Sequence, residues 1–286
     1  MNDRIRFGPA GNSRSFYDQG HKGTLEAPLW LRGQGLDAFE YSFGHGIRGK
    51  EPLWRSLAGE MAGQDIALSV HAPYYINFCS DKDEARLKSR WYLTETLRAA
   101  ALLGAGRVVF HPGSASKQSR EDALRRAQDE LGKVLAETDT DELRSILLCP
   151  ETMGKASQLG TVEEILTLCE LDRARLLPTF DFGHINARGQ GVLRTPADFA
   201  AVFDATEARL GADAAAQAHI HFSRIEYGMA GEIRHLTFED NRWGPFFEPL
   251  ALVLAQRRYV PVVICESAGT MAEDALAMRA LYERAL

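Results

Sequence analysis

Short apolar runs, rich in β-branched and aromatic residues, recur along the chain and are mostly followed by turn residues. Runs of this length and composition are typical of buried strands. We expect strands at residues 5–7, 38–43, 66–70, 107–110, 145–149, 176–180, 218–222 and 261–265. Stretches with helical spacing lie between many of these runs. They predict helices at residues 88–103, 121–137, 162–171, 196–210, 246–256 and 272–285.

Local signals mark the ends of some of these helices. Thr161 followed by Glu164 is a capping box, in which each side chain satisfies a backbone N–H of the other residue. Thr195 caps the next helix, whose first turn contains Pro196. Gly104 lies where the helix over residues 88–103 is expected to stop.

The alternation of eight strands with helices or loops predicts an α/β protein of the (β/α)8 TIM-barrel class. A doubly wound sheet is the alternative, but it usually needs fewer strands. Because the sequence has no composition break or internal repeat, we expect a single domain over residues 1–286. The segments 44–49, 183–193 and 228–246 predict loops, and we expect the last to lie over the site.

Composition places the chain among ordinary globular proteins, with 45% hydrophobic and 25% charged residues. An apolar run of about 18 residues is absent, so we expect no membrane span. The four cysteines form no CxxC pair, which favours a reduced, cytoplasmic protein. The net charge of −6 excludes a general basic coat for nucleic acid, although bound cations can reverse the sign at one site.

Histidines and carboxylates follow six consecutive predicted strands, at the ends where TIM barrels build their sites. These residues are His71, His111, Glu151, Asp181, His184, His221 and Glu266. One such residue alone is more often a loop histidine or a salt-bridged acid. Together they would repel or stay unpaired without cations, so they predict a metal site. Mixed nitrogen and oxygen ligands suit zinc, with manganese or iron as alternatives.

Other cofactor chemistries lack support in the sequence. It contains neither a GxxxxGK[ST] phosphate loop nor a GxSxG nucleophile elbow. The glycines at 104 and 106 precede a strand instead of following one, so they do not form a dinucleotide loop. We therefore expect no nucleotide cofactor.

The strand-end residues lie in short motifs that resemble a known family. VHAPYYIN at 70–77, FHPGS at 110–114, PETMG at 150–154, FDFGH at 180–184 and CES at 265–267 occur in this order. Together they resemble the endonuclease IV family of apurinic/apyrimidinic endonucleases, and within it an endonuclease IV-like branch of archaea and bacteria. The likeness runs from about residue 66 to residue 266. It implies a TIM barrel that hydrolyses DNA 5′ to abasic sites in base excision repair.

The resemblance also implies a site for three zinc ions, and we expect two or three ions in this chain. His71 and His111 would hold one ion, and Glu151 would bridge it to a second and act as the central catalytic residue. Asp181, His221 and Glu266 would complete the second site, and His184 would hold a third ion.

The family completes the third site with an Asp-x-His pair after the seventh strand, where this chain has Ile233, Arg234 and His235. His235 matches the family histidine, whereas Ile233 cannot bind a metal. Either Glu226 or Glu232 supplies the missing oxygen, or the third ion is absent or exchanges readily. We prefer Glu226 because it lies nearer the strand end.

The family inserts side chains into DNA at the abasic gap, and Tyr74 falls on the motif position that does so. Arg188, Arg224, Arg234 and Arg242 lie in rim loops where they could contact phosphates, and we assign Arg224 and Arg234 to the DNA-binding set. An isolated loop arginine is more often simply solvated. The expected partner is DNA containing abasic sites, bound by a monomer.

A different enzyme class shares part of this ligand set. Glu151, Asp181, His221 and Glu266 alone resemble the single-metal quartet of sugar isomerases and epimerases with the same barrel. The additional strand-end histidines favour the nuclease. A third alternative is a metal-dependent binding barrel without activity, which the isoleucine at 233 keeps open. His219 points to the same side of its strand as His221, and we expect it lower in the barrel.

Overall fold

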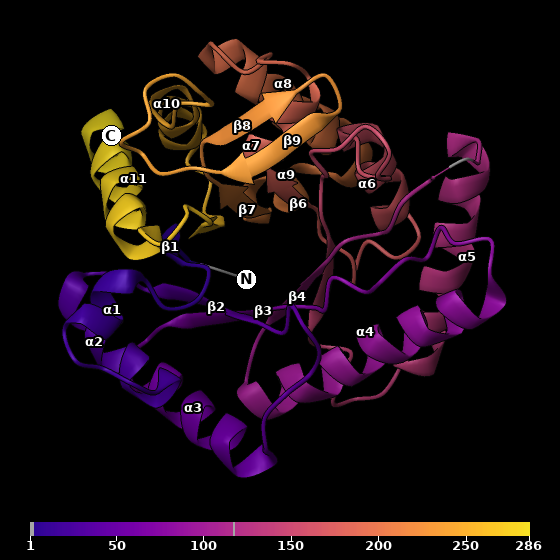
Figure 1. Ribbon diagram of the computed structural model, residues 1–286, viewed down its shortest axis with the longest axis horizontal. Helices are drawn as coiled ribbons and strands as arrows, with labels where there is room; N and C mark the ends of the chain where they lie inside the picture. Colours follow the sequence, from indigo (N-terminus) through magenta and orange to yellow (C-terminus); the bar gives the residue numbers. More distant parts are fainter. Residues whose placement is uncertain (1–2, 117) are drawn as a thin grey trace.

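The computed structural model describes residues 3–116 and 118–286. Within these residues, eight parallel strands form the barrel that the sequence predicts (Figure 1). They are β1 (Arg6–Pro9), β2 (Ala38–Ser42), β3 (Ala67–His71), β4 (Arg107–Phe110), β5 (Leu147–Pro150), β6 (Thr179–Asp181), β7 (His219–Phe222) and β10 (Val262–Cys265). The (β/α)8 prediction is therefore confirmed.

The strands run as two arcs, β1-β10-β7-β6 and β2-β3-β4-β5. Isolated parallel bridges join the arcs into a closed ring. Ala10 pairs with Glu40 between β1 and β2, and Glu151 pairs with Thr179 between β5 and β6. Closure brings the carboxyl ends of all eight strands to one rim.

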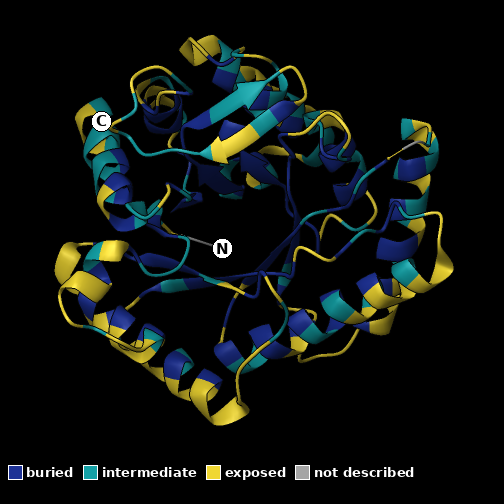
Figure 2. Ribbon diagram, viewed as in Figure 1, coloured by how far each residue is buried: buried dark blue, intermediate teal, exposed yellow. Residues whose placement is uncertain are grey.

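Helices surround the barrel and turn their apolar faces inward (Figure 2). They are α1 (Arg14–Asp18), α2 (Ala27–Gln34), α3 (Glu51–Gly63), α4 (Asp83–Leu103), α5 (Arg120–Glu137), α6 (Val162–Cys169), α7 (Phe182–Arg188), α8 (Pro196–Leu210), α9 (Ala212–Gln217), α10 (Glu248–Arg257) and α11 (Met271–Ala285), with a short 3-10 helix, η1 (Thr24–Glu26). The capping box of α6 is confirmed, since Thr161 Oγ1 accepts the N–H of Glu164 at 3.2 Å. Gly104 ends α4 in the left-handed conformation, with φ of 65°.

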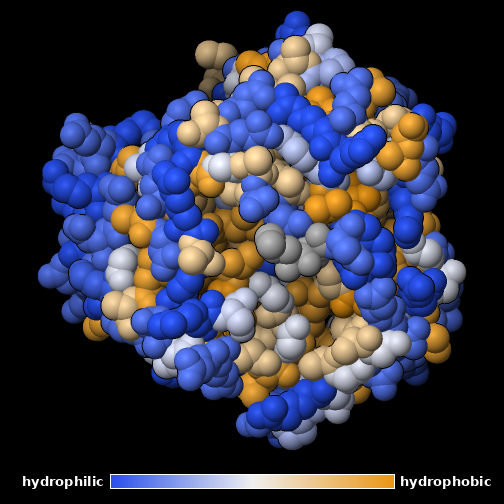
Figure 3. All heavy atoms as spheres, turned by 180° about the vertical axis from the view of Figure 1, so that it is seen from behind, coloured by the Kyte–Doolittle hydropathy of each residue, from blue (hydrophilic) through white to orange (hydrophobic). Residues whose placement is uncertain are grey.

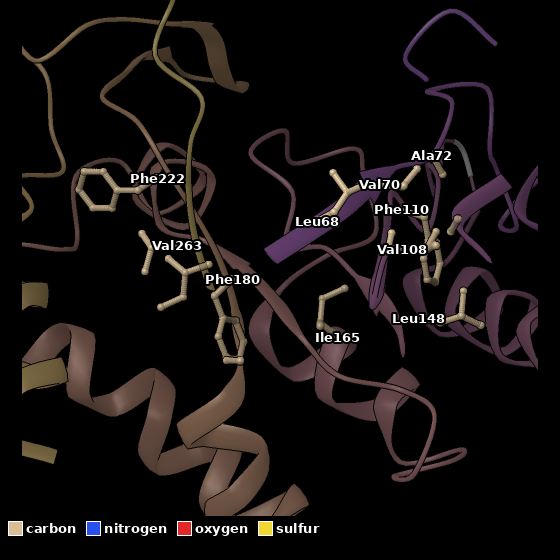
Figure 4. Packing of buried hydrophobic residues seen from close by; sticks show 14 of the residues in the cluster. Leu68, Val70, Ala72, Val108, Phe110, Leu148, Ile165, Phe180, Phe222 and Val263 are labelled. Atoms are coloured by element: carbon tan, nitrogen blue, oxygen red, sulfur yellow. The ribbon is translucent and has the colours of Figure 1, made fainter. Parts of the chain in front are cut away.

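Strand alternation separates the packing core from the barrel interior. Alternate strand residues such as Val70, Val108 and Phe180 are fully buried in the layer between sheet and helices (Figure 4). Burying each such side chain stabilises the fold by about 1.5–3 kcal/mol. The intervening residues point into the barrel, so His71 and Asp181 reach the interior because their neighbours anchor the outer layer.

Two segments differ from the loop prediction. Residues 183–188 belong to α7, which begins directly after β6 because the Asp181 side chain caps it. Residues 228–246 contain most of an antiparallel hairpin, β8 (Ile225–Gly228) and β9 (Gly231–His235), which has too few residues to show a clear period. The hairpin lies over the carboxyl ends of the strands, as expected for a loop covering the site (Figure 1).

The end of the barrel at the amino ends of the strands is apolar and contains a cavity. Figure 3 views the molecule from behind, and apolar side chains gather around the centre of that face. A cavity of about 630 Å³ lies at this end, lined by residues from the amino ends of the strands such as Ile66, Leu147 and Val262. It lies away from the strand-end histidines. Among the described residues, no helix combines the length and apolar character that crossing a bilayer requires.

Candidate metal centre

Glu151 lies at the centre of the strand-end residues. It is 1% exposed, and histidines from four other strands or helices surround its carboxylate. Glu151 Oε2 lies 3.2 Å from His71 Nε2 and 3.1 Å from His111 Nε2. Oε1 lies 3.3 Å from His184 Nδ1 and 3.2 Å from His221 Nδ1. Each oxygen of one carboxylate therefore faces a different pair of imidazoles.

A second group of ligand atoms adjoins Glu151 Oε1. It contains Asp181, His221 and Glu266, and its candidate ligand atoms lie within 4.8 Å of one another. Asp181 Oδ1 accepts the backbone N–H of His184 at 2.7 Å. Asp181 Oδ2 is buried and makes no hydrogen bond to the described residues. Oδ2 lies 3.3 Å from His184 Nδ1, and a buried acceptor without a hydrogen bond suits a cation.

A third group joins the hairpin to α7. Glu232 Oε2 lies 3.3 Å from His184 Nε2, and Glu232 Oε1 lies 3.8 Å from His235 Nε2. Gly154 makes room for this approach, because a Cβ at that position would lie 2.7 Å from Glu232 Cβ and 2.9 Å from His184 Cδ2. Ser223 Oγ lies 2.8 Å from His235 Nδ1, which leaves Nε2 facing Glu232.

Backbone carbonyls orient two of the imidazoles. His71 Nδ1 lies 2.8 Å from Ala72 O, and His184 Nδ1 lies 2.9 Å from Thr152 O. A carbonyl oxygen only accepts, so we assign the ring proton to Nδ1 in both residues. The Nε2 lone pair then faces Glu151 in His71 and Glu232 in His184, which is how a metal-binding histidine is usually held.

The electrostatics of the group favour added positive charge. Burial opposes ionisation of Glu151, but the charges of His221 and His111 hold its pKa well below the usual range. Burial raises the pKa of Glu266 to about 8, against the effect of His221, and the carboxylates of Glu151 and Asp181 add to the rise. The negative charges of these neighbouring carboxylates repel one another, and bound divalent ions would reduce this repulsion. The donor set therefore fits zinc or a similar transition metal.

Comparison with known proteins places the chain in a family. A sequence model of the xylose isomerase-like TIM barrel family matches residues 29–282. The chain belongs to this family. It is 34% identical to an uncharacterized protein of Methanocaldococcus jannaschii over 278 residues, which cover 97% of both chains. It is 31% identical to a protein of Acholeplasma laidlawii named probable endonuclease 4 over 170 residues, 58% of this chain and 55% of that protein.

Solved structures of two kinds share the family fold. Endonuclease IV from Thermus thermophilus superposes with a TM-score of 0.69 and 20% identity, covering 98% of this chain and 99% of that one. A D-tagatose 3-epimerase-like protein superposes with a TM-score of 0.71 and 18% identity, covering 98% and 97%. At these identities the structures show the fold alone. Together with the named relatives, they confirm the family resemblance expected from the motifs.

The structure contradicts the preference for Glu226 as the substitute ligand. Glu226 and Arg234 are cross-strand neighbours in the hairpin, and Glu226 Oε2 accepts from Arg234 Nε at 2.7 Å. On β9, Glu232 points toward the histidines whereas Ile233 is 57% exposed. Distance from the strand end along the chain was a poor guide, because the hairpin folds the more distant residue back over the site.

The predicted DNA-contacting residues have different surroundings. Arg224 is buried, donates to the carbonyls of Phe238 and Asp240, and stacks on Phe246 with 4.6 Å from its guanidinium carbon to the ring centre. It is therefore occupied in holding the loop after the hairpin, which contradicts its assignment to phosphate contact. Burial also lowers the pKa of Arg224.

The remaining loop arginines differ in how freely they face solvent. Arg234 is exposed but paired with Glu226. Arg188 donates to the carbonyls of Met153 and Lys155 and so fixes a neighbouring loop. Arg242 lies over the ring of Trp243, with 5.1 Å to its centre.

Tyr74 is exposed at the rim beside the candidate ligands. Its ring stacks on His111 with centroids 5.4 Å apart and an interplanar angle of 20°. It also meets His71 edge to face at 5.4 Å. A ring that is 53% exposed and rests on a candidate metal ligand is well placed to contact a bound substrate.

The sequence analysis missed Glu40. This carboxylate from β2 is 1% exposed and contacts His219 and His221 inside the barrel. The sequence did contain a signal for it. Residues of β2 alternate between facing into the barrel and facing the helices, and Glu40 occupies an inward-facing position in an otherwise apolar run. His219 lies lower in the barrel than His221, as expected, and Arg107 Nη1 lies 3.3 Å from its Nδ1.

Proposed function

We propose that the protein is a zinc-dependent phosphodiesterase that hydrolyses DNA 5′ to abasic sites, acting as a cytoplasmic monomer. One observation carries this proposal. Beyond the quartet of Glu151, Asp181, His221 and Glu266, the rim carries two further ligand groups, His71 with His111 and His184 with Glu232 and His235. A single-metal sugar enzyme does not need these additional ligands, whereas a multinuclear site for a phosphodiester uses them.

The three groups identify the residues that would hold zinc. His71 and His111 would bind one ion together with Glu151 Oε2. Asp181, His221 and Glu266 would bind a second with Glu151 Oε1, and His184, Glu232 and His235 would bind a third. Bound zinc supplies Lewis-acid stabilisation of charge on a phosphodiester and lowers the pKa of an attacking water.

The residues of the chain organise this chemistry. Glu151 shares its two oxygens between two histidine pairs, so it fixes the spacing of the first two groups. Asp181 caps α7 through Oδ1 and keeps Oδ2 free of hydrogen bonds for the second group. Glu232 brings a carboxylate from the hairpin to the third group. Most of these side chains are buried, so the site is largely screened from bulk water.

DNA would approach from the same rim. Tyr74 offers an exposed aromatic face next to His111, on which a base or sugar could stack. Arg234 and Arg242 offer exposed positive charge on the hairpin and the loop after it. The chain carries a net charge of −6, so the metal ions would provide much of the local attraction for phosphate.

A mononuclear sugar isomerase or epimerase is the second candidate. Its support is the quartet of Glu151, Asp181, His221 and Glu266, together with the fold that the chain shares with the D-tagatose 3-epimerase-like protein. In that alternative, the contacts of His111 and His184 with Glu151 would serve only to hold the carboxylate in place.

One experiment separates the two candidates. Metal-loaded protein is incubated in parallel with duplex DNA carrying a single tetrahydrofuran abasic site and with free ketohexoses. We expect a nick on the 5′ side of the abasic site, no interconversion of sugars, and loss of the nick with chelator or with Glu151→Gln. Interconversion of a ketose by protein that leaves the DNA intact would establish the second candidate instead.

A further inference from the structure

A polar layer lies inside the barrel directly below the candidate metal ligands. TIM-barrel interiors are usually filled by branched apolar side chains. Here the inward-facing residues Glu40, Ser69 and His219 are almost fully buried and lie together, and Arg107 adjoins them at the amino end of β4. Burying a carboxylate is costly unless its oxygens are satisfied, so this layer requires a physical reason.

The side chain of Glu40 is held on several sides. Oε2 accepts from Ser69 Oγ at 2.8 Å and lies 3.1 Å from His219 Nε2. Oε1 lies 3.0 Å from His221 Nε2. The backbone of Glu40 closes the barrel, since its carbonyl accepts the N–H of Gly11 at 3.0 Å. The carboxylate therefore has little freedom to move away from His221.

This contact sets which nitrogen of His221 faces the site. Nε2 points down to Glu40, whereas Nδ1 points up, 3.2 Å from Glu151 Oε1 and 3.5 Å from Glu266 Oε1. The orientation is opposite to that of His71, whose Nδ1 faces a backbone carbonyl and whose Nε2 faces Glu151. Glu40 Oε1 is the carboxylate oxygen beneath Nε2, at 3.0 Å, and neither atom makes a hydrogen bond to another described residue.

The residues behind Glu40 set the direction of the hydrogen bond at its other oxygen, Oε2. Arg107 Nη1 lies 3.3 Å from His219 Nδ1 and can only donate, so His219 Nδ1 accepts and its Nε2–H donates to Glu40. Within residues 3–116 and 118–286, no ion pair of Arg107 with a carboxylate is found. Its guanidinium contacts the carbonyl of Ala218 and the ring of His219, and the same ring contacts Glu40.

We propose that Glu40 is a positioning residue that fixes His221 as an Nδ1 ligand, with His219 and Arg107 holding Glu40 in place. A carboxylate behind a metal-binding histidine sets its tautomer and raises its basicity. The role concerns the metal ligand and not the reaction, so it applies to the nuclease and to the sugar enzyme alike.

The test reads the two nitrogens of His221 directly. The full chain is labelled with ¹⁵N-histidine, loaded with zinc, and compared with His221→Asn to assign the signals in long-range ¹H–¹⁵N spectra. We expect Nδ1 of His221 to show the shift of a zinc-bound nitrogen and Nε2 to carry hydrogen. A wild-type spectrum that shows zinc on Nε2 or hydrogen on Nδ1 would overturn the proposal, without any variant being needed.

Variants add a second readout. In Glu40→Gln, which keeps the size but removes the charge, we expect about 10- to 100-fold weaker zinc binding in chelator competition. We also expect a shifted or broadened Nε2–H signal from His221. Ser69→Ala is the matched control, because it removes a hydrogen bond to the same carboxylate without touching His221, and zinc affinity should change by less than about 3-fold.

The outcomes separate this proposal from the proposed function. Unchanged zinc affinity and an unchanged His221 spectrum in folded Glu40→Gln would overturn the role of Glu40. A wild-type chain that takes up no zinc would overturn it together with the metal centre. Zinc binding with the expected His221 spectrum but without DNA cleavage would overturn the nuclease assignment and leave the role of Glu40 standing.

Discussion

Glu232 Oε2 lies 3.3 Å from His184 Nε2, so the hairpin contributes a carboxylate to a histidine at the start of α7. The contact supplies the carboxylate that the third ligand group lacks at position 233. The motif resemblance assigns the family aspartate to the position of Ile233, which faces solvent here, whereas the neighbouring Glu232 faces the histidines. Adjacent residues on a strand face opposite sides, and the register of this hairpin shifts between Glu226 and Tyr227.

Removal of the Glu232 carboxylate should empty one metal position. We expect Glu232→Ala to lower the metal content by about one ion per chain and to weaken cleavage of abasic DNA about 10- to 1,000-fold. Glu226→Ala is the matched control on the same hairpin, since its carboxylate pairs with Arg234. Equal metal loss in the two variants, measured by elemental analysis, would show that Glu232 is not a ligand.

Restoring the family aspartate should not improve the site. Because the side chain at 233 points to solvent, we expect Ile233→Asp to leave the metal content unchanged and cleavage within about 3-fold of the wild type. Elemental analysis and rate measurements on the same preparation check this. A clear gain of metal would mean that the hairpin shifts its register to present residue 233 inward.

Glu151→Gln should abolish activity without unfolding the protein. The substitution keeps the size of the side chain but removes the charge that faces His71, His111, His184 and His221. We expect a loss of several orders of magnitude in cleavage rate and reduced metal content, with an unchanged circular dichroism spectrum. A variant that stays folded and retains more than about a tenth of the wild-type rate would contradict the central position of Glu151.

Tyr74 should contribute to DNA binding through its ring. We expect Tyr74→Ala to weaken binding of abasic duplex about 10-fold or more, since stacking on a base is worth about 1–3 kcal/mol. Tyr75→Ala is the control, because Tyr75 is equally exposed but packs against Tyr92 instead of a candidate ligand. Fluorescence anisotropy with labelled duplex measures both. Similar losses in the two variants would indicate a general effect of the loop.

Metal removal should destabilise the fold. Without metal ions, the carboxylates of the buried Glu151 and Asp181 and of the partly exposed Glu266 lie close together. Ligands that bind only the folded state stabilise it, so we expect a chelator to lower Tm by several degrees and added zinc to restore it. Differential scanning calorimetry provides the measurement. An unchanged Tm in protein shown to have lost its metal would contradict this expectation.

The sequence revealed most of the barrel and much of the site because both depend on local patterns. A run such as residues 107–110 is apolar, short and followed by His111, which fixes a strand and its functional end together. The capping box of Thr161 and Glu164 likewise acts within four residues and appears in the structure. Strand ends converge in any closed barrel, so the meeting of Glu151 with His221 follows from the fold class.

The features that the sequence did not reveal depend on long-range geometry. Whether Glu226 or Glu232 reaches His184 depends on how a hairpin folds back over the rim, and spacing along the chain carries no such information. Glu40 lies about 180 residues before His219, and only barrel closure brings them together. Arg224 follows β7 in the sequence and is expected to face the rim, yet its guanidinium donates to the carbonyl of Phe238 in the segment after the hairpin.

The number of metal ions per chain tests the central claim most directly, because ligand groups beyond the quartet are what separate a multinuclear site from a mononuclear one. The measurement is elemental analysis by mass spectrometry of the full chain, purified without added metal and normalised to protein concentration. We predict two or three transition-metal ions per chain, mainly zinc. A clean value of one ion per chain, unchanged after incubation with excess zinc, would contradict the multinuclear centre and favour the sugar isomerase or epimerase.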